Sequence, residues 1–204
     1  MPQLTFWYEF ASTYSYLSVM RIEKTAAAVS VDVVWRPFLL GPIFKSQGWT
    51  TSPFNVYPAK GRYMVRDITR IATQRGLTFR MPETFPANGL KAARLATLGV
   101  EDGWGPAFTQ AVFEAQFVQG LDISSNDVLL AILADLDLDA ADVVARANAP
   151  ENKERLREAT AKAQEIGIFG APSFTTADGE LYWGDDRLDA ALAHAADTAA
   201  RAAG

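Results

Sequence analysis

Any chemistry of this chain must proceed without a cysteine and with a single histidine. Its 204 residues contain no cysteine, which excludes disulfides, thiolate metal sites and a cysteine nucleophile of the protein's own. The one histidine, His194, lies in the alanine-rich stretch 190–200, which is typical of a surface helix and not of a catalytic centre. We predict no metal site. Reactive groups must therefore be hydroxyls, lysines, carboxylates, backbone amides or a bound cofactor.

Ser12 is the first candidate functional residue. It lies between an aromatic run typical of a buried strand, residues 3–10, and the predicted start of a helix. Ligands of strand–helix–strand units bind at this end of the strands, where the free amides of a helix N-terminus stabilise an anion. A thiolate held there would have a lowered pKa and could accept a hydrogen bond from the Ser12 hydroxyl. The alternative is that Ser12 only caps the helix.

Two segments near the C-terminus have residue types suited to binding. A cis bond between Ala171 and Pro172, just before a short predicted strand, would present the Ala171 backbone to an extended peptide. Amides at residues 183–187, where the last helix begins, could hold a carboxylate, and Asp186 could pair with an ammonium group. The alternatives are a trans proline in a loop and an ordinary helix cap.

The elements that must position these residues are strands at both ends of the chain and helices between them. We expect strands at residues 3–10, 31–39, 173–176 and 180–183. We expect helices at residues 14–29, 60–75, 89–98, 104–118, 126–136, 140–147 and 152–166, and from about residue 186, with a long loop at 41–58. This order predicts an α/β, thioredoxin-like mixed four-stranded sheet (residues 1–40 and 167–204) with an all-helical insertion domain (residues 41–166).

Charge and hydropathy exclude several classes of partner. The net charge is −5, with +7 on residues 1–100 and −12 on residues 101–204, so we expect no nucleic-acid partner. Arg62, Arg66 and Arg70 recur at helical spacing and are interpreted as a solvated face. No segment is long and apolar enough to cross a membrane, and the first ten residues lack the pattern of a signal peptide. We therefore expect a cytoplasmic protein with no membrane partner.

Six short motifs, in order along nearly the whole chain, resemble those of 2-hydroxychromene-2-carboxylate isomerases and kappa-class glutathione transferases. Residues 10–17 (FASTYSYL) are similar to the Asp-Phe-x-Ser-Pro-x-Ser-Tyr-Leu motif of that family. The other matches are residues 36–41 (RPFLLG), 60–64 (KGRYM) with Asp67, 85–88 (FPAN), 169–172 (FGAP) and 183–187 (WGDDR). Each motif is weak alone, but six in register are specific.

The resemblance implies that glutathione supplies the thiol that the chain lacks. By the family's pattern, Ser12 would hold the glutathione sulfur as a thiolate, and Ala171, before a cis Pro172, would pair with the cysteinyl backbone. Lys60 would meet a carboxylate of the tripeptide, and Asn88 would face the second substrate. The γ-glutamyl end would be held by Asp185, Asp186 and Arg187.

Four residues depart from the family's pattern. Thr13 replaces a proline and Glu9 replaces an aspartate. Trp49 stands where kappa-class members have a glutathione-binding asparagine, so Trp49 or Asn55 is expected to make that contact. Asp185 stands where relatives have serine or asparagine. Its side chain adds negative charge beside the γ-glutamyl carboxylate, so we expect backbone amides to bind that carboxylate instead.

The family's reaction gives the main functional hypothesis, a glutathione-dependent isomerase. The thiolate would add to a small aromatic carboxylate of the 2-hydroxychromene-2-carboxylate type, and rotation and elimination would give trans-o-hydroxybenzylidenepyruvate. The resemblance also suggests a homodimer. The alternatives are a kappa-like glutathione transferase or peroxidase acting on other electrophiles, and a non-catalytic glutathione- or peptide-binding protein. A thiol–disulfide oxidoreductase shares the fold but is excluded by the absence of cysteine.

Overall fold

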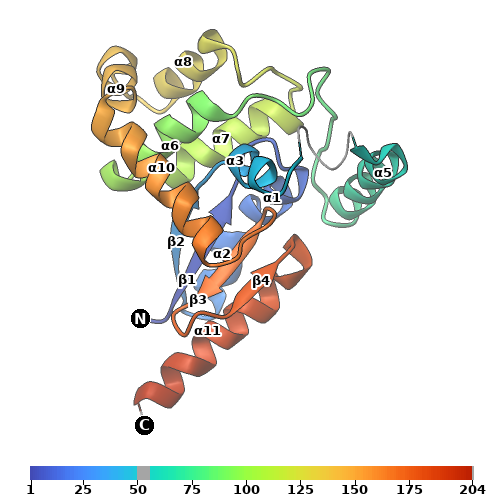
Figure 1. Cartoon of the computed structure of the whole chain (residues 1–204), viewed down its shortest axis with the longest axis vertical. Helices are drawn as coiled ribbons and strands as arrows, with labels where there is room; N and C mark the ends of the chain where they lie inside the picture. The colour runs from blue at the N-terminus through green and yellow to red at the C-terminus, as the bar shows by residue number, and fades with distance from the viewer. Residues whose placement is uncertain (50–55, 204) are drawn as a thin grey trace.

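The computed structural model describes residues 1–49 and 56–203. Figure 1 shows the strands in the middle of the molecule, helices α6 to α10 above them, and α11 below. The elements are β1 (Gln3–Tyr8), α1 (Thr13–Val19), α2 (Ile22–Ala28), β2 (Asp32–Pro37), α3 (Leu40–Ser46), α5 (Pro58–Gln74), α6 (Leu90–Asp102), α7 (Gly105–Phe117), α8 (Asn126–Asp135), α9 (Ala140–Ala147), α10 (Pro150–Glu165), β3 (Ser173–Thr176), β4 (Leu181–Trp183), a 3₁₀ turn (Asp185–Arg187) and α11 (Leu188–Ala203).

The four strands form one mixed sheet in the order β2-β1-β3-β4. β1 is parallel to β2 and antiparallel to β3, which in turn is antiparallel to β4. Parallel neighbours require a crossover connection, and α1 with α2 provides it. The predicted α/β class, the mixed four-stranded sheet and the C-terminal hairpin are therefore confirmed. Among the described helices, none has the length and apolar character needed to cross a membrane.

β1 is buried on both faces, which explains its aromatic composition. Leu4, Phe6 and Tyr8 point into the main core, and Phe6 stacks on Phe174 of β3 with a centroid distance of 5.4 Å. Trp7 points to the opposite face and packs in a second cluster. That cluster also contains Phe38, Ile43, Ala163 and Ile168. The end of β1, where Ser12 follows, is thus fixed by packing from two sides.

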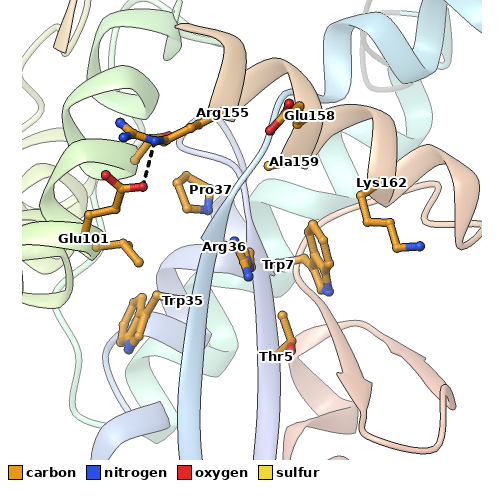
Figure 2. A pocket seen from close by; sticks show the side chains of 12 residues that line it. Thr5, Trp7, Trp35, Arg36, Pro37, Glu101, Arg155, Glu158, Ala159 and Lys162 are labelled. Atoms are coloured by element: carbon orange, nitrogen blue, oxygen red, sulfur yellow. Dashed lines mark ion pairs between the residues drawn. The ribbon is translucent and has the colours of Figure 1, made fainter. Parts of the chain in front are cut away.

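A groove of about 420 Å³ lies between the β1–β2 edge of the sheet and helices α6 and α10 (Figure 2). Trp7 and Trp35 contribute to its lining, and an ion pair of 2.8 Å joins Arg155 to Glu101 across it. None of the predicted site residues lines this groove. It marks the boundary between the sheet and the inserted helices, and it is separate from the Ser12 region.

Two predictions of local structure are wrong. The loop predicted at residues 41–58 contains α3, whose Ile43 is buried in the second cluster, and α5 already begins at Pro58. Pro42 lies in the first turn of α3, where a missing amide hydrogen costs little. The single helix predicted at 14–29 is divided into α1 and α2 at Arg21, whose guanidinium reaches across to the segment before α11.

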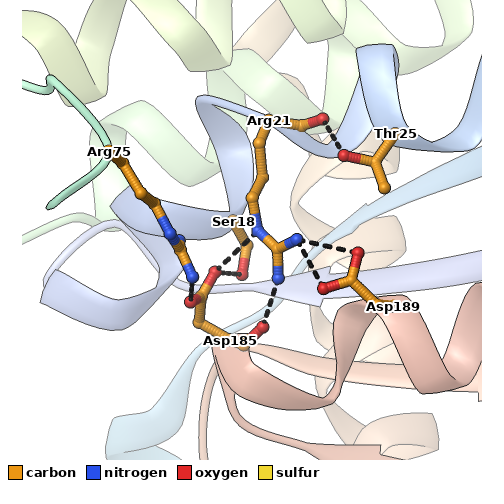
Figure 3. Close-up of polar contacts among 6 residues, drawn as sticks. All are labelled: Ser18, Arg21, Thr25, Arg75, Asp185 and Asp189. Atoms are coloured by element: carbon orange, nitrogen blue, oxygen red, sulfur yellow. Dashed lines mark hydrogen bonds and ion pairs between the residues drawn. The ribbon is translucent and has the colours of Figure 1, made fainter. Parts of the chain in front are cut away.

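A buried carboxylate, Asp185, holds the turn before α11 against two distant segments (Figure 3). The residue is 3% exposed and accepts a hydrogen bond from the Ser18 hydroxyl at 3.0 Å. It also pairs with Arg21 at 3.4 Å and with Arg75 at 2.7 Å. Arg21 in addition donates to the Asp185 carbonyl at 2.7 Å and pairs with Asp189 at 2.9 Å. Because Arg75 directly follows α5, these contacts tie α5 to the α1–α2 junction and to the turn.

Breaking this cluster should destabilise the fold more than removing an exposed arginine. Arg75→Met leaves the buried Asp185 with one arginine instead of two, and we expect a loss of about 1–3 kcal/mol in the free energy of unfolding, because Arg75 is itself partly solvated. Urea denaturation followed by circular dichroism measures this loss. Arg66→Met, on the exposed face of the same helix, is the matched control and should change stability by less than about 0.5 kcal/mol. Equal effects of the two substitutions would contradict the role of Asp185.

Candidate functional site

Ser12 joins the start of α1 to the turn that contains Pro172. Its extended backbone and its acceptance of the Ser15 amide hydrogen at 3.1 Å make it the N-cap of α1. The same hydroxyl donates to the Ala171 carbonyl at 2.9 Å, across 159 residues of sequence. The Ala171–Pro172 bond is cis, as predicted. Ser12 is therefore a helix cap, and it also brings the two predicted binding segments into contact.

Ala171 keeps part of its backbone available for a ligand. Its amide hydrogen donates to no partner among the described residues, and the residue is partly exposed. β3 begins two residues later, at Ser173, which pairs with Trp7 of β1. An extended peptide that aligned with this backbone would reach the Ala171 amide and would compete with Ser12 for the Ala171 carbonyl.

The turn at residues 184–187 lies beside the cis proline. The Gly184 amide donates to the Pro172 carbonyl at 3.0 Å. The Asp185 carboxylate is engaged by Arg21 and Arg75 and its carbonyl by Arg21, so only its backbone amide remains for a ligand. The side chains of Asp186 and Arg187 are 73% and 60% exposed and form a loose pair at 3.5 Å. The side chains able to reach a ligand here are therefore those of Asp186 and Arg187.

The other predicted glutathione contacts lie on α5 and on the segment before it. Lys60 is exposed, and its ammonium group lies 5.2 Å from the centre of the Tyr57 ring. Trp49 is 37% exposed and packs on Phe44 with a centroid distance of 5.6 Å. Neither side chain hydrogen-bonds to Ser12 or Ala171. Asn55 lies outside the described residues.

Asn88, the predicted contact of the second substrate, is exposed at the start of α6. Its side-chain oxygen accepts the Leu90 amide hydrogen at 3.1 Å, so the residue, which precedes the N-cap Gly89, provides an acceptor for the first amide of this helix. Its amide nitrogen has no hydrogen-bond partner among the described residues and remains able to donate. The hydrogen bond to Leu90 would hold that nitrogen in a fixed position.

A phenol–carboxylate contact fixes α5 against the start of α1. The Tyr14 hydroxyl donates to Asp67 at 2.9 Å, and Arg70 donates to the same carboxylate at 2.9 Å. The pKa of Tyr14 is raised well above its ordinary value, first by burial and then by the hydrogen bond to Asp67. Tyr14 therefore keeps its proton at neutral pH, and α5, which carries Lys60, stays next to the Ser12 turn.

Glu9 is a further functional candidate. From the sequence it was identified only as a departure from the family's pattern. Most of the residue is buried, its Oε2 accepts the Ala11 amide hydrogen at 2.9 Å, and its carbonyl accepts that of Ser12 at 3.0 Å. Burial raises the pKa of the Glu9 carboxyl to about 7, and the Ala11 hydrogen bond opposes this shift. The sequence contained no signal for this pKa, because the pKa depends on packing around the carboxyl.

His194 has a structural position, as its place in an alanine-rich helix predicts. Its Nδ1 lies 2.7 Å from the Tyr182 hydroxyl and its Nε2 lies 3.0 Å from Asp178. These contacts attach α11 to the β3–β4 hairpin. Neither of the contacts involves Ser12 or the cis-proline turn.

Comparisons with known proteins agree with this architecture. The family model of the DSBA-like thioredoxin domain matches residues 3–196. A 2-hydroxychromene-2-carboxylate isomerase of Sphingobium xenophagum is 27% identical over 188 residues, which span 91% of this chain and 94% of that protein. Glutathione S-transferase kappa 2 of Caenorhabditis elegans is 25% identical over 201 residues, which span 90% of this chain and 87% of that protein.

A solved structure of a 2-hydroxychromene-2-carboxylate isomerase has the same fold. It superposes with a TM-score of 0.87 over 98% of both chains, at 21% sequence identity. The resemblance to 2-hydroxychromene-2-carboxylate isomerases and kappa-class glutathione transferases and the thioredoxin-like fold are therefore confirmed, and the relatives found are named as enzymes. With its mixed sheet, its cis-proline turn and the match over residues 3–196, the chain belongs to the DSBA-like thioredoxin domain family.

Proposed function

We propose that the chain is a glutathione-dependent isomerase that converts 2-hydroxychromene-2-carboxylate-type substrates to trans-o-hydroxybenzylidenepyruvate. The observation that carries the proposal is the 2.9 Å hydrogen bond from Ser12 to the Ala171 carbonyl in a chain without cysteine. A site built in this way can bind a thiol peptide but has no thiol of its own. The isomerase from Sphingobium xenophagum, similar over nine tenths of the chain, supports the same activity.

The residues around Ser12 fit glutathione. The Ala171 amide is without a partner among the described residues and can pair with a peptide backbone. The exposed Asp186 carboxylate can accept hydrogen bonds from the ammonium group of a γ-glutamyl end, and the neighbouring backbone amides can hold its carboxylate. Glutathione, when bound, would supply a nucleophilic thiolate.

Ser12 would serve as the hydrogen-bond donor that keeps the sulfur anionic. A serine hydroxyl has one proton to donate, and in the free protein it goes to the Ala171 carbonyl. A peptide amide that pairs with this carbonyl would free the hydroxyl proton for the sulfur. The hydroxyl oxygen would still accept the Ser15 amide hydrogen and would therefore stay in place.

Further parts of the proposal concern the remaining contacts and the setting of the enzyme. We propose that Lys60 binds a carboxylate of the tripeptide, that Trp49 or Asn55 makes the loop contact, and that Asn88 faces the aromatic substrate. A cytoplasmic location would suit this chemistry, because that compartment keeps thiols reduced. A homodimer is proposed from the family resemblance, and sedimentation equilibrium tests it.

A kappa-type glutathione transferase is the second candidate function. The similarity to glutathione S-transferase kappa 2 over 90% of the chain favours it. Both candidates require glutathione at Ser12 and differ in the fate of the second substrate. Formation of a stable conjugate with an aryl halide, without isomerisation, would support the transferase. Binding of glutathione without turnover of either substrate would support a non-catalytic protein.

Ser12→Ala should lower kcat/KM for isomerisation about 10²–10³-fold, because it removes the donor to the sulfur anion. The product's absorbance follows the reaction, and isothermal titration calorimetry follows glutathione binding. Ser12→Thr keeps the hydroxyl and should recover most of the rate. Asp139→Ala removes a comparable cap from α9, far from the site in sequence, and should leave the rate unchanged. Wild-type activity in Ser12→Ala would show that Ser12 is only a cap.

Asp186→Asn should weaken glutathione binding about tenfold, because it removes a charged partner of the ammonium group. Titration calorimetry measures the affinity. Cysteinylglycine, which lacks the γ-glutamyl residue, is the control ligand. Its affinity should be the same for wild type and Asp186→Asn. An equal loss for both ligands would place the effect of Asp186 elsewhere in the site.

A further inference from the structure

We propose that Glu9 exchanges protons with the second substrate and so opens and closes the substrate's hemiketal ring, a role that rests on the proposed isomerase function. The proposal starts from the place of the Glu9 carboxyl in the fold. Oε2 is held by the Ala11 amide at 2.9 Å, within the turn that ends at Ser12. Oε1 has no hydrogen-bond partner among the described residues.

The free oxygen of Glu9 faces the segment that carries Asn88. A Cβ atom placed on Gly89 would lie 3.4 Å from Glu9 Oε1 and 3.0 Å from Phe10 Cβ, so the two segments are in close contact. The carboxyl thus lies between the turn proposed to hold the sulfur and the residue proposed to face the aromatic substrate. This is the position that a group acting on that substrate requires.

The ionisation of Glu9 suits an exchange of protons. Burial raises its pKa to about 7 and the Ala11 amide opposes that shift, and no charged side chain of the described residues contributes to it. The Ala11 amide faces the carboxyl from its own turn, and the backbone of Gly89 faces it from the segment before α6. Both protonation states are therefore populated near neutral pH, which is the condition for general acid–base catalysis.

The other titratable groups described near Ser12 are less suited to this task. Tyr14 donates its proton to Asp67 and has a raised pKa, so it does not act as a base at neutral pH. The Asp185 carboxylate forms ion pairs with Arg21 and Arg75. His194 is attached to the β3–β4 hairpin by Tyr182 and Asp178.

The substrate's structure defines the step. A 2-hydroxychromene-2-carboxylate has a hydroxyl and the ring oxygen on the same carbon, which makes it a hemiketal. The Glu9 carboxylate would remove the hydroxyl proton, a carbonyl would form, and the bond to the ring oxygen would break with its electron pair on that oxygen. The ring oxygen would then take the proton from the Glu9 carboxylic acid and become a phenol. Nothing is oxidised or reduced, and Glu9 returns to its starting state.

Ring opening is needed because a double bond inside a six-membered ring is held cis. After opening, that bond can reach the trans geometry of the product. Glu9 would therefore act before the step that depends on the thiol, and only in the reverse reaction would it act after that step. A loss of Glu9 should lower isomerisation without lowering glutathione affinity.

The test measures kcat/KM for isomerisation at saturating glutathione, from about pH 5.5 to about pH 9, in wild type, Glu9→Gln, Glu9→Asp and Glu23→Gln. Wild-type kcat/KM should rise through pH 7 as Glu9 loses its proton, and Glu9→Gln should lack this rise and be about 10²–10⁴-fold slower at pH 8. Glu9→Asp should keep the rise, because it keeps the carboxylate. Glu23→Gln, on the exposed face of α2, should match wild type.

Two measurements are independent of turnover. Carbon-13 NMR of glutamate-labelled protein should show a carboxyl resonance, absent in Glu9→Gln, that titrates near pH 7 and shifts when trans-o-hydroxybenzylidenepyruvate is added. Calorimetry should give Glu9→Gln and wild type the same glutathione affinity within about twofold.

The outcomes separate the two proposals. A wild-type protein that binds glutathione without isomerising the substrate overturns the proposed function. An active wild type whose rate and pH profile are unchanged in Glu9→Gln overturns the role of Glu9 alone. A Glu9 resonance that titrates in the ordinary carboxyl range also overturns that role.

Discussion

A carboxylate buried without compensation would destabilise this fold by several kcal/mol, and the arrangement around Asp185 follows from that constraint. Arg21, at the break between the two crossover helices, reaches Asp185, and Arg75 at the end of α5 reaches the same carboxylate. The turn that leads into α11 is then held at the side of the cis proline by the Gly184 amide. One charge thus fixes three segments that are far apart in sequence, and Ser12, Ala171 and Asp186 take their relative positions from it.

The hydrogen bonds of the Ser12 hydroxyl determine what the site can offer to a ligand. In the free protein it donates its one proton to the Ala171 carbonyl, and its oxygen accepts the Ser15 amide hydrogen. A ligand that takes over the Ala171 carbonyl would change the partner of that proton without moving the oxygen. In the proposed function this ligand is a peptide with its own thiol, which would supply the thiol that the chain lacks.

Features that depend on residues close in sequence could be predicted, whereas features that depend on contacts between distant residues could not. The strands and the hairpin were predictable, because aromatic runs and an Asp-Gly turn are local signals, whereas the cis form of the Ala171–Pro172 bond was implied only by the family resemblance. α3 was missed because Gly41 and Pro42 suggest a loop, whereas burial of Ile43 against the sheet decides the outcome. Arg75 and Asp185 are 110 residues apart in sequence, and no local sequence pattern predicts that they pair. Glu9 was visible as a substitution, but its raised pKa arises only from tertiary packing.

The ion pair in Figure 2 and those of Asp185 in Figure 3 should respond differently to dissolved salt. Counterions screen charges in solvent over about 8–10 Å at physiological ionic strength, but they screen buried charges much less. Arg155 of α10 and Glu101 of α6 are each nearly half exposed, so salt weakens the ion pair between these two inserted helices. Asp185 is enclosed, so its contacts with Arg21 and Arg75 persist. Rising ionic strength would therefore loosen the contact between α6 and α10 within the insertion while the contacts around Asp185 are retained.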